Sequence, residues 1–76
     1  MVCLTHIDVK RKRQRFYIVS MARTLFGEWS LVREWGRCGS PGTLRSWSFK
    51  REQDAQKAEQ RSIKRRLRHG YTVRAS

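Results

Sequence analysis

The fold is decided by residues 28–49, which run Glu-Trp-Ser-Leu-Val-Arg-Glu-Trp-Gly-Arg-Cys-Gly-Ser-Pro-Gly-Thr-Leu-Arg-Ser-Trp-Ser-Phe. Two stretches rich in β-branched and aromatic side chains, 28–37 and 43–49, flank a segment of glycine, serine and proline at 39–42. This order is typical of two antiparallel strands joined by a turn. Proline sets φ at the first central position of a type II turn, and glycine at 42 supplies the positive φ required next. We therefore predict a β-hairpin in the middle of the chain.

The first strand of this hairpin contains a local inconsistency. Strict alternation places five side chains on one face: Trp29, Leu31, Arg33, Trp35 and Arg37. That face begins apolar and ends cationic, so it cannot all be core. Either a bulge near Glu34 or Gly36 rotates the end of the strand, or the strand runs past the core into solvent. In both cases we expect Trp35 and Arg37 at the rim, while Trp29 and Trp47 join the core.

Two further strands are predicted on the N-terminal side of the hairpin. Residues 3–9 alternate between apolar and polar, and residues 15–22 are β-branched and aromatic. Between them lies a run of cations, which consists of Lys10, Arg11, Lys12, Arg13 and Arg15. Like charges at this density do not pack, so we predict that 10–15 form a solvated turn. Residues 24–27 form the connection to the hairpin.

A helix is predicted on the C-terminal side, over residues 52–69, which lack glycine and proline. Its apolar stripe consists of Ala55, Ala58, Ser62, Ile63 and Leu67. Gly70 is placed to end the helix in a left-handed conformation, and Tyr71 is expected to fold back onto it. The chain is thus predicted to be one α+β domain over 1–76. It has an antiparallel sheet of about four strands, one C-terminal helix packed on one face, a core over about 3–71, and a frayed tail at 72–76.

The charge is strongly unbalanced, with 18 Lys and Arg against 6 Asp and Glu, giving a net charge of +12 among 76 residues. Solubility accounts for a net charge of about 2–8 in a small domain. The cations near the end of the helix also have a structural explanation, because they complement the helix dipole. The excess still indicates a polyanionic partner, and nucleic acid is the natural one.

Other classes of site find little support in the sequence. Cys3 and Cys38 have no neighbouring ligands at metal-binding spacing, so we expect no metal site. Two reduced thiols are favoured, and a single intramolecular disulfide is the alternative. Residues 36–42 are rich in glycine but precede a strand, and therefore lack the helix N-terminus that a phosphate-binding glycine loop needs. No catalytic constellation, signal peptide or membrane span is recognisable. We expect a monomeric cytoplasmic protein that is not an enzyme, with no cofactor and no membrane partner.

For binding, the triplet Trp35-Gly36-Arg37 is well suited to a nucleic acid. Tryptophan stacks on a base or sugar, and arginine forks onto phosphate. Gly36 lacks a Cβ, so a sugar-phosphate or a partner backbone can approach closely. Taken alone, Trp35 would more often be a core residue.

The longer segment Trp35-Gly36-Arg37-Cys38-Gly39-Ser40-Pro41-Gly42 resembles the signature of the WGR domain, which is named after its Trp-Gly-Arg triplet. The context is similar too: Arg15-Phe16-Tyr17 upstream, and Phe26-Gly27-Glu28-Trp29-Ser30-Leu31 leading into the motif. The resemblance covers residues 3–71 and extends to short stand-alone bacterial WGR proteins. It implies an antiparallel sheet with a helix against it.

In poly(ADP-ribose) polymerases, WGR domains bind DNA at breaks, which associates the family with DNA repair. The motif tryptophan packs there against the sugar at a 5′ strand end, and the motif arginine helps to link neighbouring domains. The resemblance implies these roles for Trp35 and Arg37. Two departures are visible. Arg51 stands at the helix start, where the family often has a capping residue, and the zinc fingers and catalytic domain of those polymerases are not in this sequence.

The sequence therefore predicts a DNA-binding module that contacts the sugar-phosphate backbone and strand ends without reading base sequence, and that would be nucleoid-associated. The predicted contacts are Trp35, Gly36, Arg37, Arg33, Lys10, Arg11, Lys12, Arg13 and Arg15. DNA is favoured over RNA. The alternatives are an RNA-binding module and a protein-interaction module whose Arg37 face docks an acidic partner.

Overall fold

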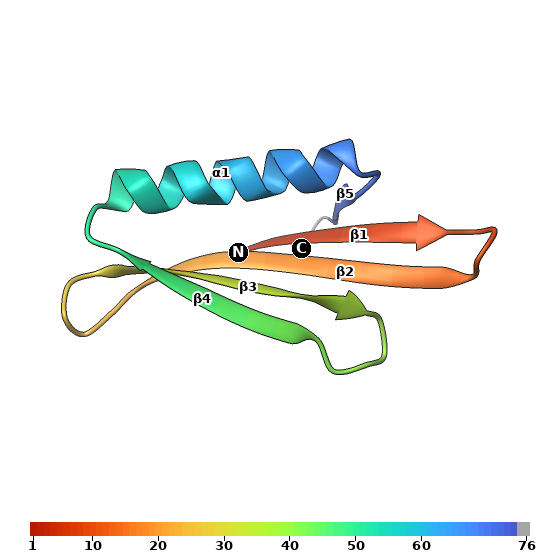
Figure 1. The fold of residues 1–76 in the computed structure, drawn as a ribbon, viewed down its shortest axis with the longest axis horizontal. Helices are drawn as coiled ribbons and strands as arrows, with labels where there is room; N and C mark the ends of the chain where they lie inside the picture. The colour runs from red at the N-terminus through yellow and green to blue at the C-terminus, as the bar shows by residue number, and fades with distance from the viewer. Residues whose placement is uncertain (75–76) are drawn as a thin grey trace.

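A computed structural model describes residues 1–74 and shows an antiparallel sheet with one helix packed against it (Figure 1). The elements in chain order are β1 (Val2–Asp8), β2 (Arg13–Arg23), β3 (Trp29–Arg37), β4 (Thr43–Phe49), α1 (Glu52–Arg68) and β5 (Thr72–Arg74). The predicted α+β class, with a helix on one face of an antiparallel sheet, is confirmed.

The sheet has five strands in the order β4-β3-β2-β1-β5, and every neighbouring pair is antiparallel. The frayed tail predicted at 72–76 is wrong for Thr72–Arg74, because these residues form β5 on the outer edge of β1. The Thr72 hydroxyl donates a hydrogen bond to the Thr5 carbonyl at 3.4 Å. Residues 75 and 76, the rest of the predicted tail, lie outside the described residues.

The pairing of β3 decides between the two explanations offered for its mixed face. Its register with β2 is continuous from Trp29 to Arg37, and its register with β4 is continuous from Trp29 to Trp35. A bulge would place two residues of one strand opposite one of the other, and neither ladder shows this. The strand therefore runs past the core toward solvent, and its alternation is kept to the end.

The hydrophobic core lies between the sheet and α1. Its buried members are Leu4, Tyr17, Val19, Leu31 and Tyr71. The helix contributes Ala55, which is fully buried, together with half-buried residues such as Ile63. Buried apolar side chains contribute about 1.5–3 kcal/mol each to stability, so this small cluster holds the helix on the sheet.

The three tryptophans are distributed differently from the prediction. Trp35 is half-buried and packs against the core. Trp47, expected in the core, is 40% exposed, because it lies on the edge strand β4. Trp29 is half-buried but is not part of the core cluster, so its expected core position is also wrong.

The turn between β3 and β4 lies two residues before the predicted type II turn at 39–42. The Ser40 amide donates a hydrogen bond to the Arg37 carbonyl at 3.1 Å, and Gly39 takes the positive φ of 85°. Gly42 does not have a positive φ. Position 42 needs glycine for lack of space instead, because a Cβ there would lie 2.8 Å from Cζ of Phe16 and 2.9 Å from the carbonyl oxygen of Trp35.

The two ends of α1 differ in how well they are capped. Arg51 occupies the N-cap with extended backbone angles, and its side chain makes no capping hydrogen bond. At the other end, the amides of Gly70 and Tyr71 donate to the carbonyls of Leu67 and Arg66, which is a Schellman motif. Gly70 has a φ of 89°, so its predicted role as the helix stop is confirmed.

The β1–β2 connection is shorter than the predicted turn over 10–15. Only residues 9–12 form turns, and β2 already begins at Arg13. The Arg11 amide donates to a carboxylate oxygen of Asp8 at 3.2 Å, which closes the turn, and Lys12 has a φ of 52°. The cations at 13 and 15 therefore belong to the sheet, where their direction is set by the strand.

The β2–β3 connection lies at the opposite end of the sheet (Figure 1). It is a compact turn in which the Gly27 amide donates to the Thr24 carbonyl at 3.1 Å and the Glu28 amide donates to the Thr24 hydroxyl at 3.1 Å. Leu25 and Phe26 at its tip are almost entirely exposed.

Candidate nucleic-acid interface

Every arginine of the three strands β2, β3 and β4 projects from the same face of the sheet. Directly paired residues of an antiparallel sheet share a face, and residues alternate along each strand. By this register, the arginines share the face of Tyr17 and Val19, which α1 covers. They are Arg13, Arg15, Arg23, Arg33, Arg37 and Arg45. The opposite face carries apolar and small polar side chains from the same strands, with Glu34 as their one charge. The sheet is therefore strongly polarised.

Two pairs of these arginines lie directly opposite each other. Arg33 is the partner of Arg45 across β3 and β4, and Arg15 is the partner of Arg37 across β2 and β3. Like charges in directly opposed positions destabilise a sheet. A bound anion between the side chains would remove this repulsion, so the pairs are better suited to binding than to stability.

A cleft of about 350 Å³ opens where the end of α1 crosses this face. Its lining comes from β2, β3 and the second half of the helix, and consists of Tyr17, Arg33, Trp35, Ser62, Arg65, Arg66 and His69. No carboxylate lines it. The cleft combines a large aromatic surface with three guanidinium groups, which is the chemistry that binds sugar and phosphate.

Arg33 is held between two tryptophans at the side of this cleft. Its guanidinium carbon lies 3.9 Å from the ring centroid of Trp47 and 5.9 Å from that of Trp35. Stacking of this kind contributes about 0.5–1 kcal/mol at exposed sites. The Nε atom of Arg33 is buried and has no hydrogen-bond partner among the described residues. The side chain is thus positioned by aromatic rings, and its Nε donor is left unpaired within residues 1–74.

Arg66 is positioned in a similar way from the helix. Its guanidinium carbon lies 4.3 Å from the Tyr17 ring centroid and 5.4 Å from that of Tyr71. Tyr17 in turn lies 6.4 Å from Trp35, centroid to centroid. Because Tyr17 and Tyr71 are buried, they form a rigid base for Arg66. The charge of Arg66 is therefore held at the cleft, whereas a free helix terminus would leave it in solvent.

Several cations lie toward the same end of the molecule as the cleft (Figure 1). The β1–β2 turn, the end of β3 with the β3–β4 turn, and the last turn of α1 all lie toward that end. These segments carry Lys10, Arg11, Lys12, Arg37, Arg65, Arg66 and Arg68. The acidic residues of the first helical turn, Glu52 and Asp54, lie at the far end. The molecule is therefore polarised along its length as well as between its faces.

The structure brings together some of the residues predicted from sequence and separates others. Trp35 and Arg33 line the cleft, while Arg37 and Arg15 pair beside it. Gly36 lies on the opposite face, where a Cβ would be 3.1 Å from Cα of Gly42. Its missing side chain makes room for the protein's own backbone. The remaining predicted contacts, Lys10, Arg11, Lys12 and Arg13, lie along the neighbouring hairpin.

Sequence reasoning did not find Arg45, Tyr17, Arg65, Arg66 or His69 as parts of this site. Arg45 was recognisable from alternation along 43–49, because it shares the parity of Trp47. The helix cations were explained by the dipole, and only the rotation of the helix over the sheet shows that Arg65 and Arg66 face the cleft.

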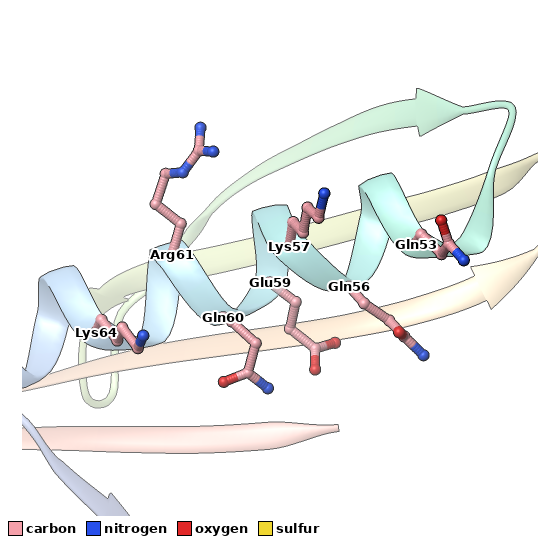
Figure 2. A pocket seen from close by; sticks show the side chains of 7 residues that line it. All are labelled: Gln53, Gln56, Lys57, Glu59, Gln60, Arg61 and Lys64. Carbon is pink, nitrogen blue, oxygen red and sulfur yellow. The ribbon is translucent and has the colours of Figure 1, made fainter.

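A larger hollow of about 680 Å³ lies along α1 but does not form a binding site. All its lining residues come from the outer side of this one helix, and in Figure 2 their side chains diverge with no second element to enclose them. Among residues 1–74, no three His, Cys, Asp or Glu side chains are grouped as metal ligands. Nothing helical in that same part of the chain has both the length and the apolar character that a bilayer crossing needs.

Comparison with known proteins tests the resemblance seen in the sequence. The family model of the WGR domain matches residues 1–76, so the resemblance carried by residues 35–42 is confirmed. An uncharacterized protein of Sinorhizobium fredii, y4dW, is 33% identical over 70 residues. The match covers 92% of this chain and 34% of that protein, so the chain spans about a third of the length of the curated relative.

Proposed function

We propose that this chain, which belongs to the WGR domain family, is a DNA-binding module that holds a strand end in the cleft between β3 and α1. The observation that carries the proposal is the composition of this cleft: a half-buried Trp35 among Arg33, Arg65 and Arg66, with no carboxylate in the lining. Its walls offer aromatic ring surface and guanidinium groups, which suit a sugar and its phosphate.

In this proposal the ring of Trp35 packs against the terminal sugar of a DNA strand. A sugar or base inside a duplex is flanked by its neighbours on both sides, whereas a terminal one exposes a face. Arg33 and Arg66 take the nearest phosphates, because their guanidinium groups are already held by aromatic rings. Arginine forks onto phosphate oxygens with two parallel hydrogen bonds. The contacts involve only backbone groups and a ring face, so the module does not read base sequence.

The cations of the β1–β2 hairpin and of the paired strands extend the contact to phosphates further along the duplex. They include Lys10, Arg11, Lys12, Arg13, Arg15 and Arg37. Each neutralised phosphate contributes about −0.9 to the slope of log affinity against log salt concentration. If five phosphates are contacted, the slope is about −4.5.

Two variants separate the roles of ring and charge. Trp35→Leu keeps apolar volume against the core but removes the stacking ring, so the preference for duplex ends is lost while the salt slope stays. Lys12→Ala removes an exposed cation, so affinity falls for every DNA and the slope becomes shallower by about 0.9. Fluorescence anisotropy over a range of salt concentrations measures both. The proposal fails if Trp35→Leu keeps the wild-type preference for ends, or if single-stranded RNA displaces duplex DNA at equal concentration.

A further inference from the structure

Trp47 is a large aromatic residue that the fold leaves partly exposed. It is 40% exposed on β4, the edge strand of the sheet, and belongs to no part of the core cluster. The guanidinium carbon of Arg33 lies 3.9 Å from its ring centroid and so covers one side of the ring. Part of the side chain stays open to solvent. An open, rigidly held indole is a surface on which a base can stack.

Trp29 is a useful comparison, because an arginine side chain also lies over its ring. The guanidinium carbon of Arg23 lies 5.9 Å from its ring centroid, which is a looser contact than that of Arg33 with Trp47. Trp29 is half-buried, and Arg23 is its direct partner at the end of the sheet far from the cleft. The close stack and the exposure are therefore particular to Trp47.

The surroundings of Trp47 connect it to the cleft. The guanidinium carbon of Arg33 lies within 6 Å of the ring centroids of both Trp35 and Trp47, so the two rings are adjacent surfaces. Arg45 is the partner of Arg33 across the ladder and lies on the same face, two residues before Trp47. By the register of β3 and β4, a strand leaving Trp35 toward the edge of the sheet thus meets the cation of Arg45 and then the ring of Trp47. Aromatic rings that alternate with cations along a path are typical of sites for single strands.

We propose that the Arg33–Trp47 pair is a second stacking subsite, which takes an unpaired base of a single-stranded DNA overhang that continues from the end held at Trp35. Arg45 contacts the phosphate beside that base. The base must be unpaired, because bases inside a duplex are stacked on one another and offer no free face. This inference rests on the proposed function and adds the form of DNA that the site prefers.

The test compares a blunt duplex with the same duplex carrying a 5′ or a 3′ overhang of about four nucleotides. We expect the wild type to bind one overhang substrate about tenfold more tightly than the blunt duplex. Trp47→Leu removes this gain, so it weakens binding of the overhang duplex more than binding of the blunt duplex, which loses only the part of the Arg33 contact that the Trp47 ring positions. Trp47→Phe keeps most of the gain. Trp29→Leu is the matched control and retains the overhang preference. A 2-aminopurine base in the overhang reports stacking directly, since its fluorescence is quenched by the wild type and not by Trp47→Leu.

The inference is overturned if the wild type binds blunt and overhang duplexes equally. It is also overturned if Trp47→Leu weakens binding of both substrates by the same factor, since Trp47 would then act on the fold alone. A single-stranded oligonucleotide separates this inference from the proposed function. Binding of the oligonucleotide that depends on Trp47, without binding of the blunt duplex, supports the stacking subsite and refutes recognition of duplex ends. Binding of neither DNA refutes both.

Discussion

Replacement of Arg45 by threonine is expected to raise stability and lower DNA affinity at the same time. Arg45 lies directly opposite Arg33 on the edge strand β4. Opposed like charges cost about as much as a favourable cross-strand pair contributes, which is roughly 0.2–1 kcal/mol. Threonine is a good strand former, so Arg45→Thr should stabilise the domain by that amount. For a domain of this size the melting temperature then rises by about 1–8 °C.

The same substitution removes one cation from the proposed DNA-binding face. The slope of log affinity against log salt should therefore become shallower by about 0.9. Thermal unfolding followed by circular dichroism measures the first effect, and fluorescence anisotropy measures the second. The gain in stability should fade near 1 M salt, where the screening length is about 3 Å. A rise in the melting temperature together with a fall in DNA affinity would indicate that the charge pair serves binding at a cost in stability.

Lys57→Gln is the matched control for this experiment. Lys57 is an exposed cation on the outer side of α1 and has no directly opposed arginine (Figure 2). Its removal lowers the net charge equally but should change neither the melting temperature nor the salt slope. The reasoning is refuted if Arg45→Thr destabilises the domain, or if both variants stabilise it equally, because general charge repulsion would then account for the effect.

Three further substitutions test separate parts of the structure. Arg51→Ser supplies the missing N-cap and should stabilise the domain by about 0.5–2 kcal/mol in urea unfolding; no gain would contradict the cap geometry. Gly42→Ala places a Cβ against Phe16 and the backbone of Trp35, and should destabilise it by about 1–3 kcal/mol; a neutral result in the same assay would mean that the space is not needed. Phe26→Ser changes a nearly fully exposed side chain, so stability and DNA affinity should stay within about 0.5 kcal/mol of the wild type; a larger effect would show a contact absent from this structure.

The sheet and helix were predictable because their signals are local. The hairpin of β3 and β4 follows from two β-rich stretches around a glycine-proline segment, and α1 follows from composition and the stop at Gly70. The strand β5 was not predictable from three residues, because its pairing with β1 joins segments 67 positions apart. Contacts of that range depend on the whole fold.

The site was predictable only in part, for a similar reason. Residues 35–37 and the alternation along β3 placed Trp35, Arg33 and Arg37 on one face, as observed. How far the helix covers that face is a property of packing, and it decides that Trp47 on the edge strand stays exposed. The same packing brings Arg65 and Arg66 to the cleft. A helical charge pattern alone cannot distinguish cations that complement the dipole from cations that face a ligand.

The central claim is that the cleft at Trp35 holds the end of a DNA strand. It is tested most directly by competition between a blunt linear duplex and a closed circle of the same sequence for the wild-type protein, at about 50 mM salt, where phosphate contacts are strong. We predict that the linear duplex competes more effectively, in proportion to the number of its ends. Equal competition by the circle would contradict the claim.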